Sequence, residues 1–95
     1  MYAMIRHYRF DPKHAAEINR LVSEQFQPLI KQMHGFVHWA WIDTGNGEGA
    51  SFSVFQDKGG AEASLSLAGD FTAKHMTHLM TGKPAVIAGN VMAYA

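Results

Sequence analysis

Two histidines in the last third of the chain are the first candidates for chemistry. His75 and His78 are three residues apart within a stretch of helical periodicity. With Ala61 taken as zero and about 100° per residue, His75 is about 40° from the centre of the apolar stripe, while His78 is at its margin near Phe71. We therefore expect His75 to point inward, where it could bind haem iron or act as an acid or base near neutral pH. The alternative is a histidine that only satisfies the core or the helix end.

Other forms of catalysis have little support in the sequence. The spacing of His75 and His78 could place two imidazoles on one metal, but there is no HExxH pattern and no nearby carboxylate. The chain has no cysteine and no GxSxG motif for a nucleophile. The glycine-rich stretch at 45–49 opens no helix, so it is not a phosphate loop. We expect neither a dedicated metal site nor a nucleophilic mechanism.

Three more side chains could handle protons or orient a substrate. Arg6 and Tyr8 alternate onto one face of the N-terminal stretch, where they would offer a cation and a phenol to an anionic or phenolic ligand. If that face does not meet the helices, the pair instead belongs to a salt link in a dimer interface. Asn19, on the first predicted helix, completes the predicted catalytic set of His75, Tyr8, Arg6 and Asn19.

A second set of residues is expected to contact the ligand itself. The predicted substrate-binding residues are His38, Phe26, Phe71 and His78. The alternative for His38 is a surface or interface side chain. Trp39 and Trp41 share one face of the same stretch, and wide aromatic side chains there are more often core or interface than catalytic.

The periodicity of the sequence predicts six elements. Residues 2–10, 35–44, 50–56 and 86–95 have strand character, and residues 12–33 and 58–80 have helical spacing. Asp11 and Asp57 can cap the two helices, Pro28 should kink the first helix or tighten its last turn, and Asn46-Gly47 indicates a hairpin. The order predicts an α+β ferredoxin-like βαββαβ fold, a four-stranded antiparallel sheet with two helices on one face.

Composition narrows the class of protein. The 95 residues leave room for a single domain over 1–95, and 47% of them are hydrophobic, so a chain this small and free of disulfides is expected to gain buried area by self-association. Helices can cover only one face of the sheet, and an exposed face bearing tryptophans would be an interface. We therefore expect a homodimer.

Charge and the N-terminus exclude other partners. Eight basic residues balance eight acidic ones, which disfavours nucleic acid and anionic membranes as partners. The first ten residues lack the apolar region of a signal peptide, and no apolar run is long enough to span a bilayer. A cytoplasmic protein is the expectation.

Four stretches together resemble a known family. They are IRHYRF, FQPLIKQMHGF, WIDTGNGEGASFSVFQDKGGAEAS and KPAVIAGNV, and they are similar to the antibiotic-biosynthesis-monooxygenase-like domains of the dimeric α/β-barrel superfamily. The resemblance covers nearly the whole chain. It implies a dimer with a small-molecule cavity between the sheet and the helices of each protomer.

The resemblance implies three alternative functions. The first is a cofactor-independent monooxygenase or oxidoreductase, without metal or flavin, that acts on or binds a small aromatic molecule. The second is a haem-binding or haem-degrading protein that uses His75, although the first strand lacks the asparagine of such relatives and both tryptophans lie on the second strand. The third is a non-catalytic dimeric small-molecule-binding or stress-response module.

Overall fold

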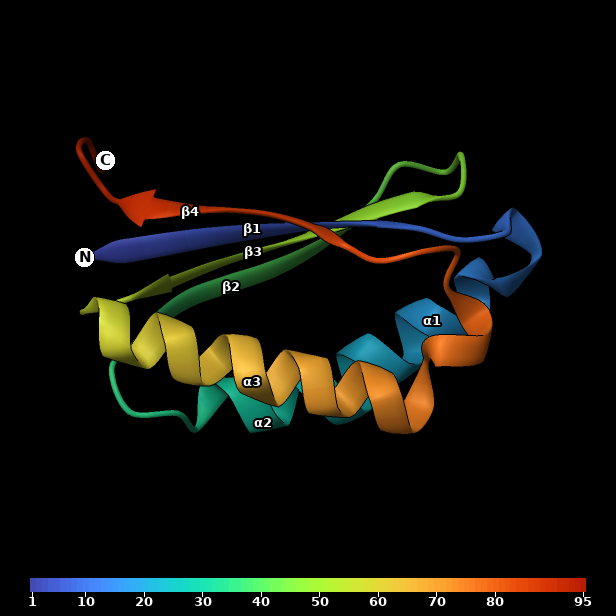
Figure 1. Ribbon diagram of the computed structural model, residues 1–95, viewed down its shortest axis with the longest axis horizontal. Helices are drawn as coiled ribbons and strands as arrows, with labels where there is room; N and C mark the ends of the chain where they lie inside the picture. The colour runs from blue at the N-terminus through green and yellow to red at the C-terminus, as the bar shows by residue number, and fades with distance from the viewer.

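A computed structural model describes the protein over all of residues 1–95 and has the predicted βαββαβ order (Figure 1). The strands are β1 (Tyr2–Arg9), β2 (Phe36–Asp43), β3 (Glu48–Phe55) and β4 (Ala85–Asn90). They form a four-stranded antiparallel sheet in the order β2-β3-β1-β4. The predicted α+β ferredoxin-like fold is confirmed. None of the helices combines the length and the apolar character that a bilayer-spanning segment needs.

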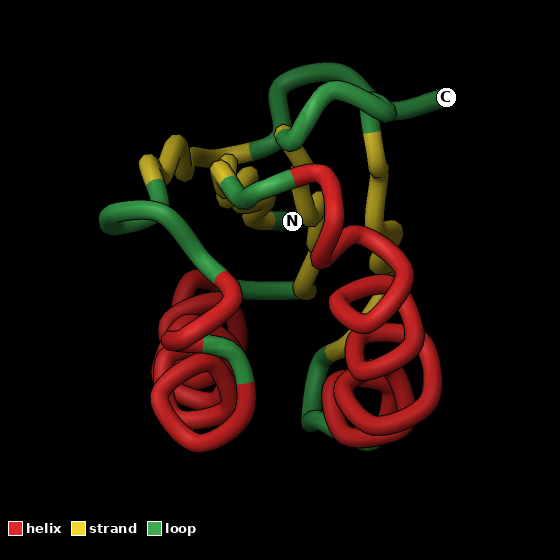
Figure 2. Tube along the Cα trace, turned by 90° about the vertical axis from the view of Figure 1, so that its right-hand side faces the viewer, coloured by secondary structure: helices red, strands yellow, loops and turns green.

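Two helical rods lie side by side on one face of this sheet (Figure 2). The first consists of η1 (Pro12–His14), α1 (Ala15–Leu21), η2 (Val22–Phe26) and α2 (Gln27–Lys31), and the second of α3 (Lys58–His75) followed by η3 (Thr77–Leu79). Both predicted caps are confirmed, because Asp11 Oδ1 accepts from the N–H of Lys13 and Asp57 Oδ1 accepts from the N–H of Gly60. The caps fix where each rod leaves the sheet.

The first rod widens at its middle. Pro28 has no N–H for the carbonyl of Glu24, and its ring would clash with that carbonyl in a regular α-helix. The segment η2 is a π-helix, in which the N–H of Gln27 reaches back five residues to the carbonyl of Val22. The predicted irregularity is therefore present, but the expected tightening is wrong, because a wider turn moves the proline ring clear of the preceding turn.

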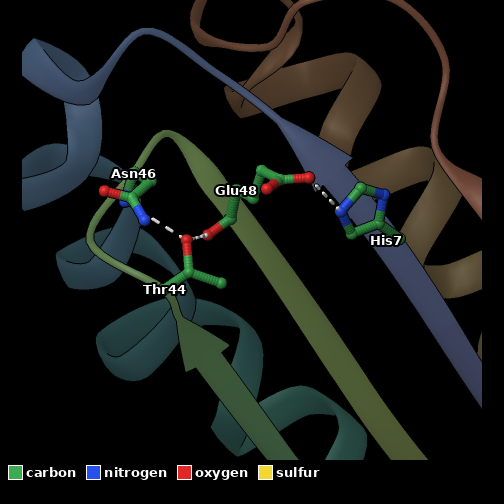
Figure 3. A network of polar contacts seen from close by, with 4 residues as sticks. All are labelled: His7, Thr44, Asn46 and Glu48. Atoms are coloured by element: carbon green, nitrogen blue, oxygen red, sulfur yellow. Dashed lines mark hydrogen bonds and ion pairs between the residues drawn. The ribbon is translucent and has the colours of Figure 1, made fainter.

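The hairpin between β2 and β3 is confirmed, but the residues with positive φ are Gly45 and Gly47 rather than the pair Asn46-Gly47. Gly45 and Gly47 have φ of +86° and +81°, whereas Asn46 does not have a positive φ. The hydroxyl of Thr44 accepts from the N–H of Asn46 at 3.2 Å and donates to the carbonyl of Glu48 at 3.0 Å (Figure 3). The two glycines make the turn, and the threonine hydroxyl ties it together.

The inner face of the sheet packs against the rods. In β1 the alternation places Met4, Arg6 and Tyr8 inward, and all three are buried. The core also takes buried side chains from every helical segment that crosses the sheet, and these are Ile18, Leu21, Val22, Phe26, Ile30, Ala61, Ala68 and Phe71. Burial of this apolar face is the main force that holds rods and sheet together.

The outer face of the sheet carries a continuous apolar row. Ala40, Phe52, Ile5 and Ile87 lie opposite one another across all four strands, and the last three are exposed, Ile87 by 71%. We call these four residues the outer row. The expectation that an exposed face bears the tryptophans is wrong, because strand alternation turns both tryptophans toward the helices.

The largest differences from the predicted ranges are at two element ends. The second helix was expected to continue to 80, but α3 ends at His75 and only a short 3-10 turn follows. The last strand ends at Asn90 rather than at 95. At the end of α3 the hydrophobic pattern continues beyond the helix, because Leu79 packs in the core from the 3-10 turn.

Candidate functional site

A small aromatic cavity lies between the sheet and the two rods. Its volume is about 30 Å³, which is enough for one or two water molecules. The walls come from β1, β2, β3, both rods and the turn after α3, through Tyr8, Val22, Phe26, Trp39, Trp41, Ser51, Ala68, Phe71, Thr72 and Met76. Val22 and Phe26 are the first and last residues of the π-helix, so the irregular turn forms one wall of the cavity.

Aromatic rings meet around this cavity in tilted and edge-on pairs. The ring centroids of Phe26 and Phe71 are 5.2 Å apart, and those of Phe26 and Trp39 are 5.8 Å apart. Tyr8 and Trp41 meet edge-on at 5.7 Å. These separations are typical of favourable aromatic pairs, and together the rings make a surface suited to a planar aromatic ligand.

Gly49 makes room for the indole of Trp41. It lies opposite Tyr8 in the pairing of β1 with β3, and a Cβ on it would come within 2.6 Å of the Trp41 ring. The indole therefore lies over the backbone of β3 where any other residue would exclude it. The contact between Trp41 and Tyr8 depends on this glycine.

A hydrogen-bonded chain holds Trp41 from behind. Its indole N–H donates to Oδ1 of Asn19 at 2.8 Å, and the amide of Asn19 donates to Asp43 at 2.9 Å. Asp43 also accepts from the N–H of Gly45 at 2.9 Å. The hydrogen bond from Asn19 makes the larger contribution to lowering the pKa of Asp43, and the bond from Gly45 lowers it further. Both bonds stabilise the carboxylate. Asn19 therefore positions Trp41 and does not itself line the cavity.

Tyr8 and Arg6 form the polar part of the site. Burial raises the pKa of Tyr8 above its ordinary value, and the Arg6 cation and the Thr72 side chain offset this only in part. The phenol is therefore neutral at pH 7 and can donate a hydrogen bond. The Arg6 guanidinium carbon is 5.3 Å from the centre of the Tyr8 ring, which is within the range of a cation–π contact.

The histidines are not where the sequence suggested. His75 is exposed, with its ring centre 4.7 Å from that of Phe71, so the expectation that it points inward is wrong. A helical angle near the stripe centre does not bury a side chain on the last residue of α3, where the helix ends. His78 is exposed on η3, and His38 is exposed on the outer face of the sheet, 6.2 Å from the ring of Tyr94.

The structure thus divides the eight predicted site residues. Tyr8, Phe26 and Phe71 line the cavity, Arg6 and Asn19 contact residues that line it, and the three histidines do not reach it. Sequence reasoning missed Trp39 and Trp41 as lining residues. Two observations could have indicated them. Both tryptophans alternate onto the same side of β2, and the hairpin register places Trp41 two residues from the position opposite Gly49.

The residues do not fit a haem held through His75. That side chain packs on Phe71 at the surface, and the cavity is far smaller than a porphyrin. No group of three or more His, Cys, Asp or Glu side chains is placed to hold a metal ion. The structure therefore gives no support to a reaction through haem iron on this residue.

The fold is shared with solved structures of oxygenases. A candidate antibiotic biosynthesis monooxygenase from Deinococcus radiodurans is 17% identical, with a TM-score of 0.82 over 100% of this chain and 96% of that one. A monooxygenase from Streptomyces coelicolor in complex with nanaomycin D is 12% identical, with a TM-score of 0.73 over 99% and 89%. SnoaB, a cofactor-independent oxygenase from Streptomyces nogalater, is 14% identical, with a TM-score of 0.73 over 98% and 94%.

No protein-family model matches the chain, and no curated protein is significantly similar to it in sequence. The similarity therefore lies in the fold. The chain has the ferredoxin-like fold of the antibiotic-biosynthesis-monooxygenase-like domains, as the resemblance in the sequence implied. A shared fold does not assign an activity, which has to be argued from the site.

Proposed function

We propose that the protein is a cofactor-independent monooxygenase-like protein that binds and oxidises a small aromatic molecule between the sheet and the helices. The observation that carries this proposal is the cavity wall, in which two tryptophans and two phenylalanines surround the neutral phenol of Tyr8. The relatives in fold named as monooxygenases or oxygenases support the same choice.

The chemistry needs a substrate that reacts with dioxygen once it has lost a proton. In an anthrone, an activated CH₂ group becomes a carbonyl: one atom of O₂ enters the product, and the other leaves as water with the two methylene hydrogens. The methylene carbon supplies all four electrons. The protein would bind the ring system, exclude bulk water and stabilise the enolate with the Tyr8 hydroxyl as hydrogen-bond donor.

A substrate of two or three fused rings requires the cavity to open. Ligand sites for such molecules usually have volumes of about 300 Å³ or more, well above the cavity of about 30 Å³. The π-helix provides the place for this change, because Val22 and Phe26 both line the cavity from an irregular turn. Turns of this kind often occur at functional sites.

Oxygen uptake tests the proposal. Chelator-treated protein is mixed with a panel of anthrones and quinols, and dissolved oxygen and quinone absorbance are followed together. We expect one O₂ consumed per quinone formed, and a loss of about a hundredfold or more in the rate for Tyr8→Phe. The exposed Tyr94→Phe is the matched control. An absence of turnover across the panel would contradict the oxygenase.

The small cavity favours a second candidate, a non-catalytic binding module. A cavity of only about 30 Å³ is small for an enzyme that turns over a polycyclic substrate. This candidate predicts that a stable quinone such as 1,8-dihydroxyanthraquinone binds and quenches tryptophan fluorescence, while no anthrone is turned over. The oxygen-uptake panel and the quenching titration together separate the two candidates.

We also propose that a second copy of the chain covers the outer row. Phe52, Ile5 and Ile87 are exposed side by side on the face without helices, and a contiguous apolar patch on a small protein marks an interface. The pair of His7 and Glu48, 2.9 Å apart (Figure 3), lies on the same face and would give the interface a polar edge. A two-fold homodimer is the usual solution for such a face.

A further inference from the structure

The guanidinium of Arg6 is a buried cation without an acceptor. Arg6 is only 7% exposed and is the only charged residue in the buried set. Its Nε and Nη1 atoms are buried with no hydrogen-bond partner, and none of the ion pairs in the molecule includes it. Burial of an unpaired charge costs several kcal/mol, so this arrangement is unfavourable unless something else supplies the acceptor.

The position of Arg6 places these donors at the edge of the aromatic cavity. On the inner face of the sheet, Trp41, Ser51 and Arg6 lie in one row across β2, β3 and β1. Trp41 and Ser51 line the cavity, as does Tyr8, whose ring contacts the guanidinium. The guanidinium thus contacts the cavity lining through the Tyr8 ring, while Arg6 is not itself one of the lining residues.

An acceptor from a second copy does not fit this geometry. The outer row that we propose as the dimer interface is on the opposite face of the sheet, because Ile5 and Arg6 are consecutive residues of β1. Within the chain, Asp43 has its hydrogen bonds to Asn19 and Gly45. A ligand bound in the cavity can supply the acceptor that the chain does not.

We infer that Arg6 is an anion subsite of the cavity and that the ligand is a planar aromatic molecule carrying a carboxylate. Nε and Nη1 of the guanidinium are charged donors without partners, and a carboxylate is the acceptor that forms strong, charge-assisted hydrogen bonds with such donors. The aromatic walls take the ring system and Arg6 takes the acid group. This inference rests on the proposed binding of an aromatic molecule in the cavity, and it adds the charge and substituent of that molecule.

Calorimetric titration with matched ligands tests the inference. The probes are 2-naphthoate and its neutral counterpart 2-naphthamide, titrated into the wild-type protein, into Arg6→Met, and into Arg9→Met as the control, since Arg9 is exposed on the same strand. We expect the wild type and Arg9→Met to bind the carboxylate at least about tenfold more tightly than the amide. Arg6→Met should lose this preference and bind the amide as the wild type does.

The outcomes separate the inference from the proposed function. Equal binding of both probes to the wild type, with no change in Arg6→Met, would overturn the anion subsite and leave aromatic binding intact. Failure of both probes to bind any of the three proteins would overturn the two proposals together. Binding of the carboxylate to Arg6→Met with the wild-type preference would also overturn the subsite.

Thermal unfolding without ligand gives a second readout. Because Met removes an unpaired buried charge and keeps an apolar side chain of similar length, we expect the midpoint of Arg6→Met to be higher than that of the wild type. If Arg6 were instead a structural residue whose guanidinium is paired in solution, the midpoint of Arg6→Met would be lower than that of the wild type. A lower midpoint for Arg6→Met would therefore count against the subsite.

Discussion

Tyr8 is the residue on which the chemistry of the site depends most. Its phenol is buried beside an arginine, yet the cost of burial outweighs the attraction of that cation and keeps the hydroxyl neutral. A neutral phenol donates a hydrogen bond to a developing enolate, whereas a phenolate would repel it. The same residue gives the protein a measurable pH dependence.

The stability of the fold should fall at alkaline pH because of Tyr8. Its pKa is raised on folding, so the unfolded chain loses the proton first, and the free energy of unfolding falls as pH rises from about 10 through the folded pKa. Urea unfolding between pH 8 and 11 measures this, with Tyr8→Phe expected to have a smaller slope. An unchanged slope in Tyr8→Phe would contradict the buried, neutral phenol.

Asn19 should affect Trp41 more than it affects the fold. Asn19→Ala removes the acceptor of the indole N–H and the link to Asp43, at a cost of about 1 kcal/mol in the free energy of unfolding. We expect the tryptophan emission to change as the indole loosens. Gln25→Ala, an exposed change on the same rod, should leave both quantities as in the wild type, and an unchanged emission in Asn19→Ala would refute the positioning role.

Among the secondary-structure elements, the strand and helix periods predicted the order of helices and strands. Which side chains line the cavity depends on how the strands pair. Strand alternation gave Arg6 and Tyr8 one face, and the structure turns that face to the helices. The same alternation could not predict whether the side of β2 that carries Trp41 faces the helices, because both sides of this strand are rich in apolar residues. Only the pairing of β2 with β3 resolves it.

The helical period failed at His75 for a related reason. A helical angle describes direction around an axis, but the exposure of a side chain also depends on whether another element lies above it. His75 is the last residue of α3 and lies beside Phe71 at the surface. Among the residues expected to meet the ligand, Tyr8, Phe26 and Phe71 line the cavity, whereas His75 does not.

Gly49 tests the fit between β3 and Trp41. Gly49→Ala places a methyl group where the indole lies, so we expect a loss of about 2 kcal/mol in the free energy of unfolding through overpacking, with altered tryptophan emission. Gly89→Ala is the matched control, since a Cβ there meets nothing within 4 Å. Equal stability of the two variants, measured by urea unfolding, would show that Trp41 does not lie over this position.

In the molecule as a whole, the two faces of the sheet differ in what they present. Its inner face, with the rods, builds the aromatic cavity, and its outer face presents the exposed apolar row. The composition predicted that a chain of 95 residues without disulfides would need a partner. The exposed surface that we propose for that partner carries Phe52 and isoleucines rather than tryptophans.

A charge on the outer row should separate the copies. Ile5→Glu places a carboxylate in the middle of the apolar row, where it would lose its hydration in a dimer. Sedimentation at micromolar concentration is expected to give twice the mass of the chain for the wild type and once for Ile5→Glu. Ala63→Glu, exposed on α3, is the control and should sediment like the wild type; a monomeric wild type would end the dimer proposal.

A variant that fills the cavity between sheet and helices shows whether this cavity is the ligand site. Ala68 lines the cavity from α3, so Ala68→Leu should occupy the space without adding charge, while the exposed Ala63→Leu should not. The measurement is quenching of tryptophan fluorescence by 1,8-dihydroxyanthraquinone. We predict saturable quenching in the wild type and in Ala63→Leu, with binding weakened at least about tenfold in folded Ala68→Leu. Equal affinity in all three proteins would contradict the account.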